Sequence, residues 1–339
     1  MTMRLDRVVR ALLSDPWAIT PEYMSLVSGV IRRRLEGRAL NEAEIAAIVA
    51  ARPTPFESRG SVAVLPVFGV ISHRMNLMTE VSGGTSTERL TGQFRQAMSD
   101  PNVSTIVFDI DSPGGGVAGV PELAAEIRAA TQKRTIAVAN DLAASAAFWI
   151  ASAADEIVMT PSGMVGSIGV VAAHQDFSEF DAKVGVKTTL VSAGEGKIDG
   201  NSLEPLSERA LADMKAKIET FYGLFVDGVV KGRNAAGQHL TGATVRDRWQ
   251  AKLFTAADAL DAGLVDRVAT LDQTLDRVAG RTRRSSVAMT DTVMPTAELH
   301  DGPVPNDDEL VNRLNKNRAD READDEARKR RARRLAVGV

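Results

Sequence analysis

A β-branched, apolar segment runs into a glycine-rich turn at Thr105-Ile-Val-Phe-Asp-Ile-Asp-Ser-Pro-Gly-Gly-Gly116. Isoleucine, valine and phenylalanine favour a strand, and a nearly continuous apolar run is typical of a strand that is covered on both faces of its sheet. The glycines allow backbone conformations that other residues avoid. From Val120 the apolar residues follow helical spacing. The segment therefore predicts a buried strand, a tight turn and a helix in succession.

Similar runs flank this segment on both sides. We expect strands at 62–71, 135–139, 156–159 and 188–191, a strand at 166–170, and helices at 87–98, 120–131 and 207–231. The stretch 256–266 predicts a short helix that turns through Gly263 into a last strand. Strands that alternate with helices indicate right-handed crossover units around a buried sheet. The predicted fold class is α/β, with a mostly parallel sheet and crossover helices.

Composition divides the chain into three parts. Residues 1–55 mix apolar and charged residues at helical spacing and predict a helical N-terminal arm. Residues 60–279 form the predicted α/β domain. Residues 280–339 are a linker and a charged tail, which we expect to be disordered, helical or scaffold-like.

The composition also excludes several classes of site. Because the chain has no cysteine, disulfides, thiolate catalysis and Cys-ligated zinc are excluded. The four histidines lack the H-E-x-x-H spacing of a zinc peptidase, so we expect no metal and no cofactor. A formal net charge of -3 does not suggest a nucleic-acid partner. No signal peptide or span of about 20 apolar residues is visible, which predicts a soluble protein without a membrane anchor.

The glycine-rich turn has a possible catalytic use. Backbone N–H groups of Gly114 and Gly115 are candidates to bind an oxyanion, since preorganised main-chain donors stabilise developing negative charge. The alternative is an ordinary turn between a strand and a helix.

A second feature is the serine in Ala143-Ala-Ser-Ala-Ala-Phe148. Ser145 stands among residues small enough to bring a helix start close to other backbone. A nucleophilic serine there gains from the helix dipole, and the N–H of Ala146 offers a second oxyanion donor. The alternative is a structural serine in an alanine-rich helix.

A third feature is the lysine in Ser192-Ala-Gly-Glu-Gly-Lys197. If Lys197 lies against the apolar strand expected at 188–191, desolvation lowers its pKa and makes it a general base. Glu195 opposes this, because a nearby carboxylate favours the charged lysine. The alternative is an exposed loop lysine.

Taken in order, these motifs resemble the signal peptide peptidase A family of serine proteases, which has a Clp/crotonase-like fold. The similarity covers about residues 60–275 and is carried by Ser112 to Gly115, Ala144 to Phe148, Gly166 to Val170, and Ser192 to Lys197. The Asp15-Pro-Trp-Ala-Ile-Thr20 segment, the charged tail and the lack of an anchor resemble the bacteriophage head maturation (prohead) protease branch.

The resemblance implies a serine endopeptidase with a Ser/Lys dyad. Ser145 is then the nucleophile, Lys197 the general base and Ser167 the residue that orients the lysine by a hydrogen bond. It also implies capsid and scaffold proteins as substrates, in the host cytoplasm and the assembling prohead. A homo-oligomer is expected, in which the lysine can come from a neighbouring subunit.

Other interpretations remain open. His174 follows Ser145 at a spacing close to that of Clp proteases, which favours a Ser/His peptidase. A crotonase acting on coenzyme A thioesters would leave Ser145 and Lys197 unexplained. The chain could also be a non-catalytic capsid scaffold or interaction protein. Small residues at Ser285-Ser-Val-Ala288 raise the further hypothesis that the enzyme removes its own tail.

Overall fold

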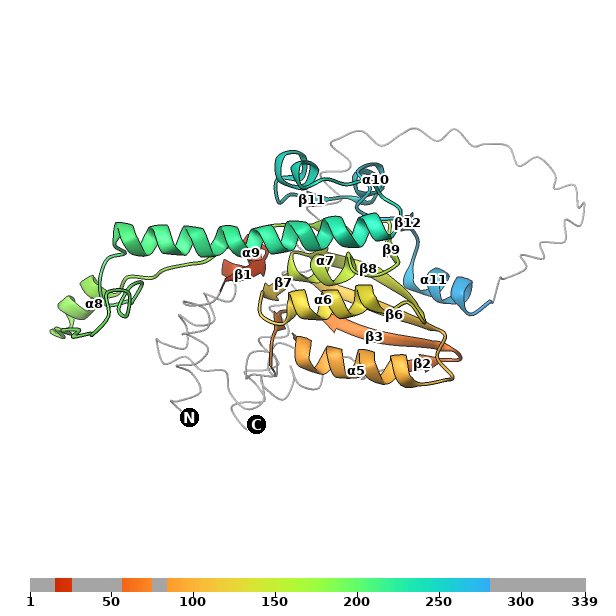
Figure 1. Cartoon of the computed structure of the whole chain (residues 1–339), viewed down its shortest axis with the longest axis horizontal. Coiled ribbons are helices and arrows are strands. Elements are labelled where there is room, and N and C mark those ends of the chain that lie inside the picture. The colour runs from red at the N-terminus through yellow and green to blue at the C-terminus, as the bar shows by residue number, and fades with distance from the viewer. Residues whose placement is uncertain (1–15, 26–56, 75–83, 281–339) are drawn as a thin grey trace, which may run out of the picture. The chain divides into compact units, whose positions relative to one another are not determined.

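A computed structural model describes residues 16–25, 57–74 and 84–280, and its centre is a mostly parallel sheet (Figure 1). The main path runs β11 (Leu253–Phe254), β10 (Met164–Gly166), β8 (Arg134–Ala144), β6 (Thr105–Ser112), β3 (Val62–Phe68) and β2 (Glu57–Arg59). Two further strands, β9 (Glu156–Met159) and β12 (Arg267–Val268), extend from β8. The pairs β2 with β3 and β10 with β11 are antiparallel, and the other pairs of this sheet are parallel. The predicted α/β class with a mostly parallel sheet is confirmed.

Alternate residues of the central strand serve two cores. Ile106 and Phe108 of β6 face the helices α5 (Thr87–Ser99), α6 (Val120–Ala129) and α7 (Ala146–Ala151). Val107 faces the opposite way and packs toward α11 (Leu271–Val278). Because side chains alternate across a strand, a sheet covered on both faces needs the continuous apolar run seen at 105–110.

The long helix α9 (Glu208–Ala235) packs its C-terminal half on α7. Phe225 stacks on Trp149 with ring centroids 4.5 Å apart. A methyl group on Gly232 would lie 1.9 Å from the carbonyl oxygen of Ser152, so the two helices meet where only glycine fits. The fully buried Arg233 forms a bidentate ion pair with Asp266, at 2.6 and 3.0 Å, next to β12. Only the C-terminal half of α9 is therefore anchored in the core.

Residues 172–211, which include only the first turn of α9, form a region that we call the arm. Figure 1 shows α8 (Ser178–Lys183) and the following loop beyond the end of the sheet, beside the start of α9. Apolar side chains are exposed here, including Phe180 at 62% and Val191 at 93%. The arm therefore presents apolar surface to its surroundings.

A second, small sheet forms over the carboxyl ends of β6 and β8. Its order is β1 (Trp17–Ile19), β7 (Gly114–Gly116), β4 (Ile71–Ser72) and β5 (Thr85–Ser86). β1 is antiparallel to β7, and β4 is parallel to it. The remaining elements are the π-helix η1 (Thr244–Trp249) and α10 (Ala256–Asp261). Among the helices of the described ranges, none combines the length and the apolar character that a membrane crossing requires.

Several expectations need correction. The strand predicted at 188–191 is wrong, because this segment is exposed and unpaired among the described residues. The strand predicted at 166–170 ends at Gly166. Within the helical arm predicted for 1–55, residues 17–19 form a strand and 21–25 are helical. The rest of residues 1–55, and the tail after residue 280, lie outside the described residues.

Candidate active site

Ser145 stands at a sharp turn between β8 and α7. Its φ of 57° and ψ of -121° are values that glycine adopts more readily than serine. Two backbone bonds hold the turn: the Ser145 N–H donates to the Gly166 oxygen at 2.8 Å, and the Trp149 N–H donates to the Ser145 oxygen at 2.9 Å. A strained residue that its surroundings hold in place is typical of a functional site. The helix start expected after Ser145 is present.

The Ser145 side chain is buried, with 1% exposure. Its hydroxyl makes one long hydrogen bond within the described ranges, donating to the carbonyl oxygen of Gly169 at 3.5 Å. The next residue, Ala146, is the first of α7. Its N–H therefore has no acceptor within the helix and is available to a negatively charged ligand oxygen.

Gly114 lies directly beside the serine. A methyl group at this position would come within 2.9 Å of the Ser145 Cβ, and its φ of 96° also favours glycine. The Gly114 N–H donates to the Ser112 Oγ at 3.2 Å, and that hydroxyl donates to the Gly69 oxygen at 2.6 Å. The first candidate oxyanion donor is thus next to Ser145 but already hydrogen-bonded.

Gly115 is fixed in the middle of the small sheet. It is the register partner of Ala18 in β1 and of Ile71 in β4. A methyl group on Gly115 would lie 1.9 Å from the Ile71 oxygen, so no side chain fits. Glycines at 114 and 115 are therefore required by close backbone approach on both sides.

Ser167 also lies near Ser145, because it follows Gly166, whose carbonyl accepts the Ser145 N–H. Ser167 has a φ of 54° and is buried, and its N–H donates to the Lys252 oxygen at 2.8 Å. Among the described residues, the Ser167 hydroxyl has no hydrogen-bond partner. In particular, it has no hydrogen bond with Lys197.

Lys197 is not brought to Ser145 within the chain. It is exposed in the loop of the arm, where its N–H donates to the Gly194 oxygen at 3.2 Å. Glu195 turns to Arg209 instead of the lysine: the two side chains are 3.5 Å apart, and Arg209 also donates to the Glu195 backbone oxygen at 2.7 Å. The carboxylate that could oppose a lysine base thus has a different partner.

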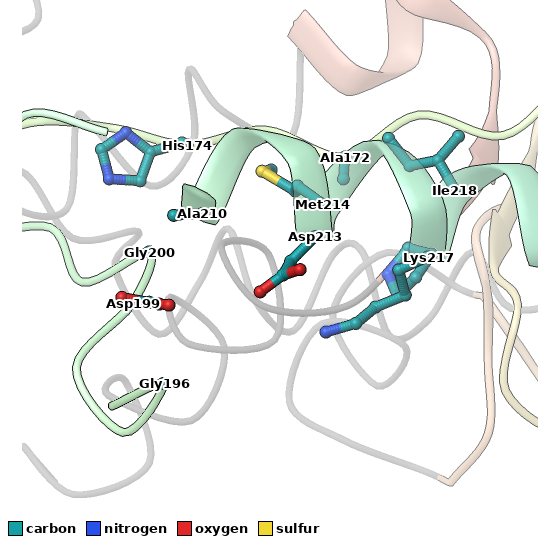
Figure 2. A pocket seen from close by; sticks show the side chains of 11 residues that line it. Ala172, His174, Gly196, Asp199, Gly200, Ala210, Asp213, Met214, Lys217 and Ile218 are labelled. Atoms are coloured by element: carbon teal, nitrogen blue, oxygen red, sulfur yellow. The ribbon is translucent and has the colours of Figure 1, made fainter. Parts of the chain in front are cut away.

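A polar cavity of about 270 Å³ lies between α9, the loop at 196–200 and residues 172–174 (Figure 2). His174 forms part of its wall, and the His174 Nε2 lies 2.8 Å from the Asn201 oxygen. Figure 2 shows Asp213 and Lys217 on the side of α9 that lines the cavity. Among the described residues, His174 has no hydrogen bond with Ser145, so the Ser/His alternative gains no support from the geometry.

Two carboxylates lie near the carboxyl ends of β6 and β8. The pKa of Asp111 is raised, mainly because partial burial withdraws the carboxyl group from water and also because Asp141 is close. The Leu142 N–H opposes this by donating to the charged form. Both residues are nevertheless exposed to solvent, which moderates the effect.

One segment at the site was not identified from the sequence. The strand β1 pairs with β7 immediately beside Ser145, and its residues are buried. Three residues are too few for an alternating pattern. The tryptophan and isoleucine favour a strand, but nothing local indicates where it pairs.

Comparison with known proteins adds to this geometry. Residues 127–283 match the model of "Peptidase family S49". The head-tail preconnector protein GP5 of Enterobacteria phage P21 is 30% identical over 285 residues, which cover 79% of this chain and 56% of that protein. The capsid assembly protease C of Escherichia phage lambda is 33% identical over 214 residues, covering 63% of this chain and 47% of that protein.

The chain spans about half the length of these two phage relatives. Among solved structures, a 1510-N membrane-bound stomatin-specific protease aligns over 65% of this chain and 86% of its own, with 14% identity and a TM-score of 0.42.

Proposed function

Since residues 127–283 match peptidase family S49, we propose that the chain is a serine endopeptidase with a Ser145/Lys197 dyad. The observation that carries the proposal is the turn at Ser145, a strained serine between β8 and α7 with Gly114 against it. Such a turn presents a nucleophile to a substrate carbonyl and surrounds it with main-chain donors.

The proposed reaction is peptide hydrolysis through an acyl-enzyme. Neutral Lys197 takes the proton of the Ser145 hydroxyl while its oxygen attacks the peptide carbonyl. The N–H groups of Ala146 and of Gly114 or Gly115 bind the oxyanion, and the Gly114 N–H exchanges its 3.2 Å bond to the Ser112 hydroxyl for this one. Lys197 then protonates the leaving amine, and water hydrolyses the ester. Ser167, beside the nucleophile, is proposed to orient the lysine.

We propose further that Lys197 acts on the Ser145 of a neighbouring copy. Two observations support this: Lys197 is exposed in the arm, and the arm extends past the sheet instead of folding over the nucleophile (Figure 1). The exposed apolar side chains of the arm give a second copy a surface on which to pack. Assembly would then be a condition for turnover.

The proposed substrates are capsid and scaffold proteins during phage head maturation in the host cytoplasm. Support comes from the similarity to the lambda capsid assembly protease and to the phage P21 preconnector protein. Co-expression with the capsid and scaffold proteins of the same phage tests it, with the Ser145→Ala chain as the control. Uncleaved partners in both expressions would contradict the assignment.

The dyad is tested with purified chains and a peptide substrate. Ser145→Ala and Lys197→Ala are each expected to reduce turnover by at least about a thousandfold, because each removes a member of one catalytic unit. Lys187→Ala, at another exposed arm lysine, is the matched control and stays active.

Mixing the Ser145→Ala and Lys197→Ala chains is expected to restore part of the activity, since a mixed pair of copies contains one complete site. If Lys197→Ala is as active as Lys187→Ala while His174→Ala is inactive, the base is the histidine and the dyad is refuted.

A further inference from the structure

The strand β1 is an extended peptide held along both of its backbone edges. On one edge, Trp17 and Val171 exchange two N–H···O bonds of 2.8 Å each. On the other edge, β1 is antiparallel to β7, with Ala18 opposite Gly115. Beyond the strand, the Thr20 N–H donates to the Pro113 oxygen at 3.1 Å. The segment 16–20 therefore lies between two polypeptide edges, one of them the glycine strand.

This peptide lies close to Ser145, the proposed nucleophile. A methyl group on Gly114 would lie 2.2 Å from the Ala18 oxygen and 2.9 Å from the Ser145 Cβ. The carbonyl of Ala18 and the side chain of Ser145 thus border a space too small for a methyl group. With β1 in place, Ser145 is 1% exposed, so a second peptide reaches it only if the surrounding segments, of which β1 is one, move.

The two backbone edges that hold β1 could bind a substrate peptide in the same way. An extended peptide that adds to a sheet edge gains main-chain hydrogen bonds whatever its sequence, and pockets for alternate side chains give it specificity. β7 offers such an edge beside the candidate oxyanion donors, and residues 169–171 offer the other.

We propose that the segment 16–20 is an internal pseudosubstrate that fills the peptide-binding groove, and that substrates bind by displacing it. The proposal rests on the proposed function for the chemistry at Ser145, but not for the occupancy of the groove. A strand of three residues with a few backbone bonds is a unit that can open locally while the main sheet stays folded.

The fit of Trp17 indicates which substrate side chain the groove accepts. The tryptophan is 7% exposed, and its Nε1 is buried without a hydrogen-bond partner among the described residues. A buried donor without a partner weakens binding. The groove at this position therefore favours a large apolar side chain without an N–H group, such as phenylalanine or leucine, over the chain's own tryptophan.

Peptide binding to full-length chains tests the proposal without any need for hydrolysis. All chains carry Ser145→Ala, and the probe is a fluorescent peptide with the sequence of residues 14–22, followed by fluorescence anisotropy. Ala18→Pro removes the N–H that faces β7, and Trp17→Ser removes the side chain that anchors β1. Glu22→Ala, at an exposed position just after the segment, is the matched control.

Both groove variants are expected to bind the probe at least about tenfold more tightly than the Ser145→Ala chain and the Glu22→Ala control, because the internal competitor is weakened. A probe with phenylalanine in place of the tryptophan is expected to bind more tightly than the unchanged probe. Thermal denaturation identifies the variants that fold. If Ala18→Pro does not fold, the comparison is made with Trp17→Ser.

Equal affinity in all folded chains, or no binding to any of them, overturns the proposal. The same β1 substitutions in chains that keep Ser145 separate the two hypotheses. Tighter binding without hydrolysis in any chain would leave the pseudosubstrate standing and refute the peptidase. Hydrolysis with unchanged affinity and rate in the β1 variants would support the peptidase and refute the pseudosubstrate.

Discussion

At the scale of single residues, Ser145 holds a conformation that serine adopts at a cost in stability. A left-handed or otherwise unfavourable backbone conformation costs about 1–3 kcal/mol, of which glycine escapes most. We therefore expect Ser145→Gly to be about 1 kcal/mol more stable than Ser145→Ala, although both lack the hydroxyl and are inactive. Urea denaturation of the two variants measures the difference. A glycine variant less stable than the alanine variant would show that the turn is not strained.

Asp111 makes stability depend on pH. A carboxyl group whose pKa is raised in the folded state binds its proton more tightly there than in the unfolded chain, so it costs stability once pH exceeds the unfolded pKa. That cost grows as pH rises through the folded pKa and is absent in acid, where the group is protonated in both states. Asp111→Asn is therefore expected to raise the Tm at pH 7–8 by up to about 2 °C, and less at lower pH.

Differential scanning calorimetry at several pH values measures this effect. Asp227→Asn, at an exposed carboxylate of α9, is the control. An increase in Tm at Asp111→Asn that is the same at every pH would contradict the explanation by titration.

The surroundings of some site residues could be predicted from the sequence, and those of others could not. The turn at Ser145 and the close approach at Gly114 were foreseeable, because a serine before an apolar helix and glycines after a buried strand are local patterns. The surroundings of Lys197 were not foreseeable. Its expected desolvation depended on a strand at 188–191, but those residues lie in the arm, where no described strand pairs with them.

At the scale of elements, the contact between α9 and α7 fixes the helix that begins directly after Ser145, the proposed nucleophile. Because a methyl group on Gly232 would collide with the Ser152 backbone, Gly232→Ala is expected to cost about 1–3 kcal/mol and to lower turnover by shifting α7. Gly223→Ala, in the same helix with only an ordinary contact at 3.7 Å, is expected to gain about 0.5–1 kcal/mol. Chemical denaturation and peptide hydrolysis of both variants measure the contrast, and equal effects would exclude a tight helix crossing.

Most of the large elements were foreseeable from their residues, and the smallest were not. The strands β6, β8 and β9 and the helices α5, α6 and α9 lie where apolar periodicity places them. β1 has three residues, and its pairing with β7 is a tertiary contact across a long sequence separation. The short strands of the second sheet depend in the same way on the glycine edge, which no local pattern reveals.

At the scale of the whole molecule, the arm carries the surface expected to join copies. Phe180 is 62% exposed in α8, so its replacement removes little from the folded monomer. Phe180→Asp is therefore expected to leave unfolding stability within about 0.5 kcal/mol and to shift the chain toward the monomer in light scattering. Leu260→Asp, an exposed leucine in α10 outside the arm, is the matched control. An unchanged oligomeric state in Phe180→Asp would move the interface elsewhere.

The covalent tether of β1 sets how the groove responds to crowding. A strand attached to its own groove competes at a fixed effective concentration, however dilute the protein is. A substrate competes only at its actual local concentration. A chain whose groove is occupied by β1 would thus not cleave a substrate present at low concentration. Substrate would displace β1 only where many copies of it are packed around the chain. Such a threshold would restrict cleavage to sites of high substrate concentration, in addition to any restriction by the substrate's sequence.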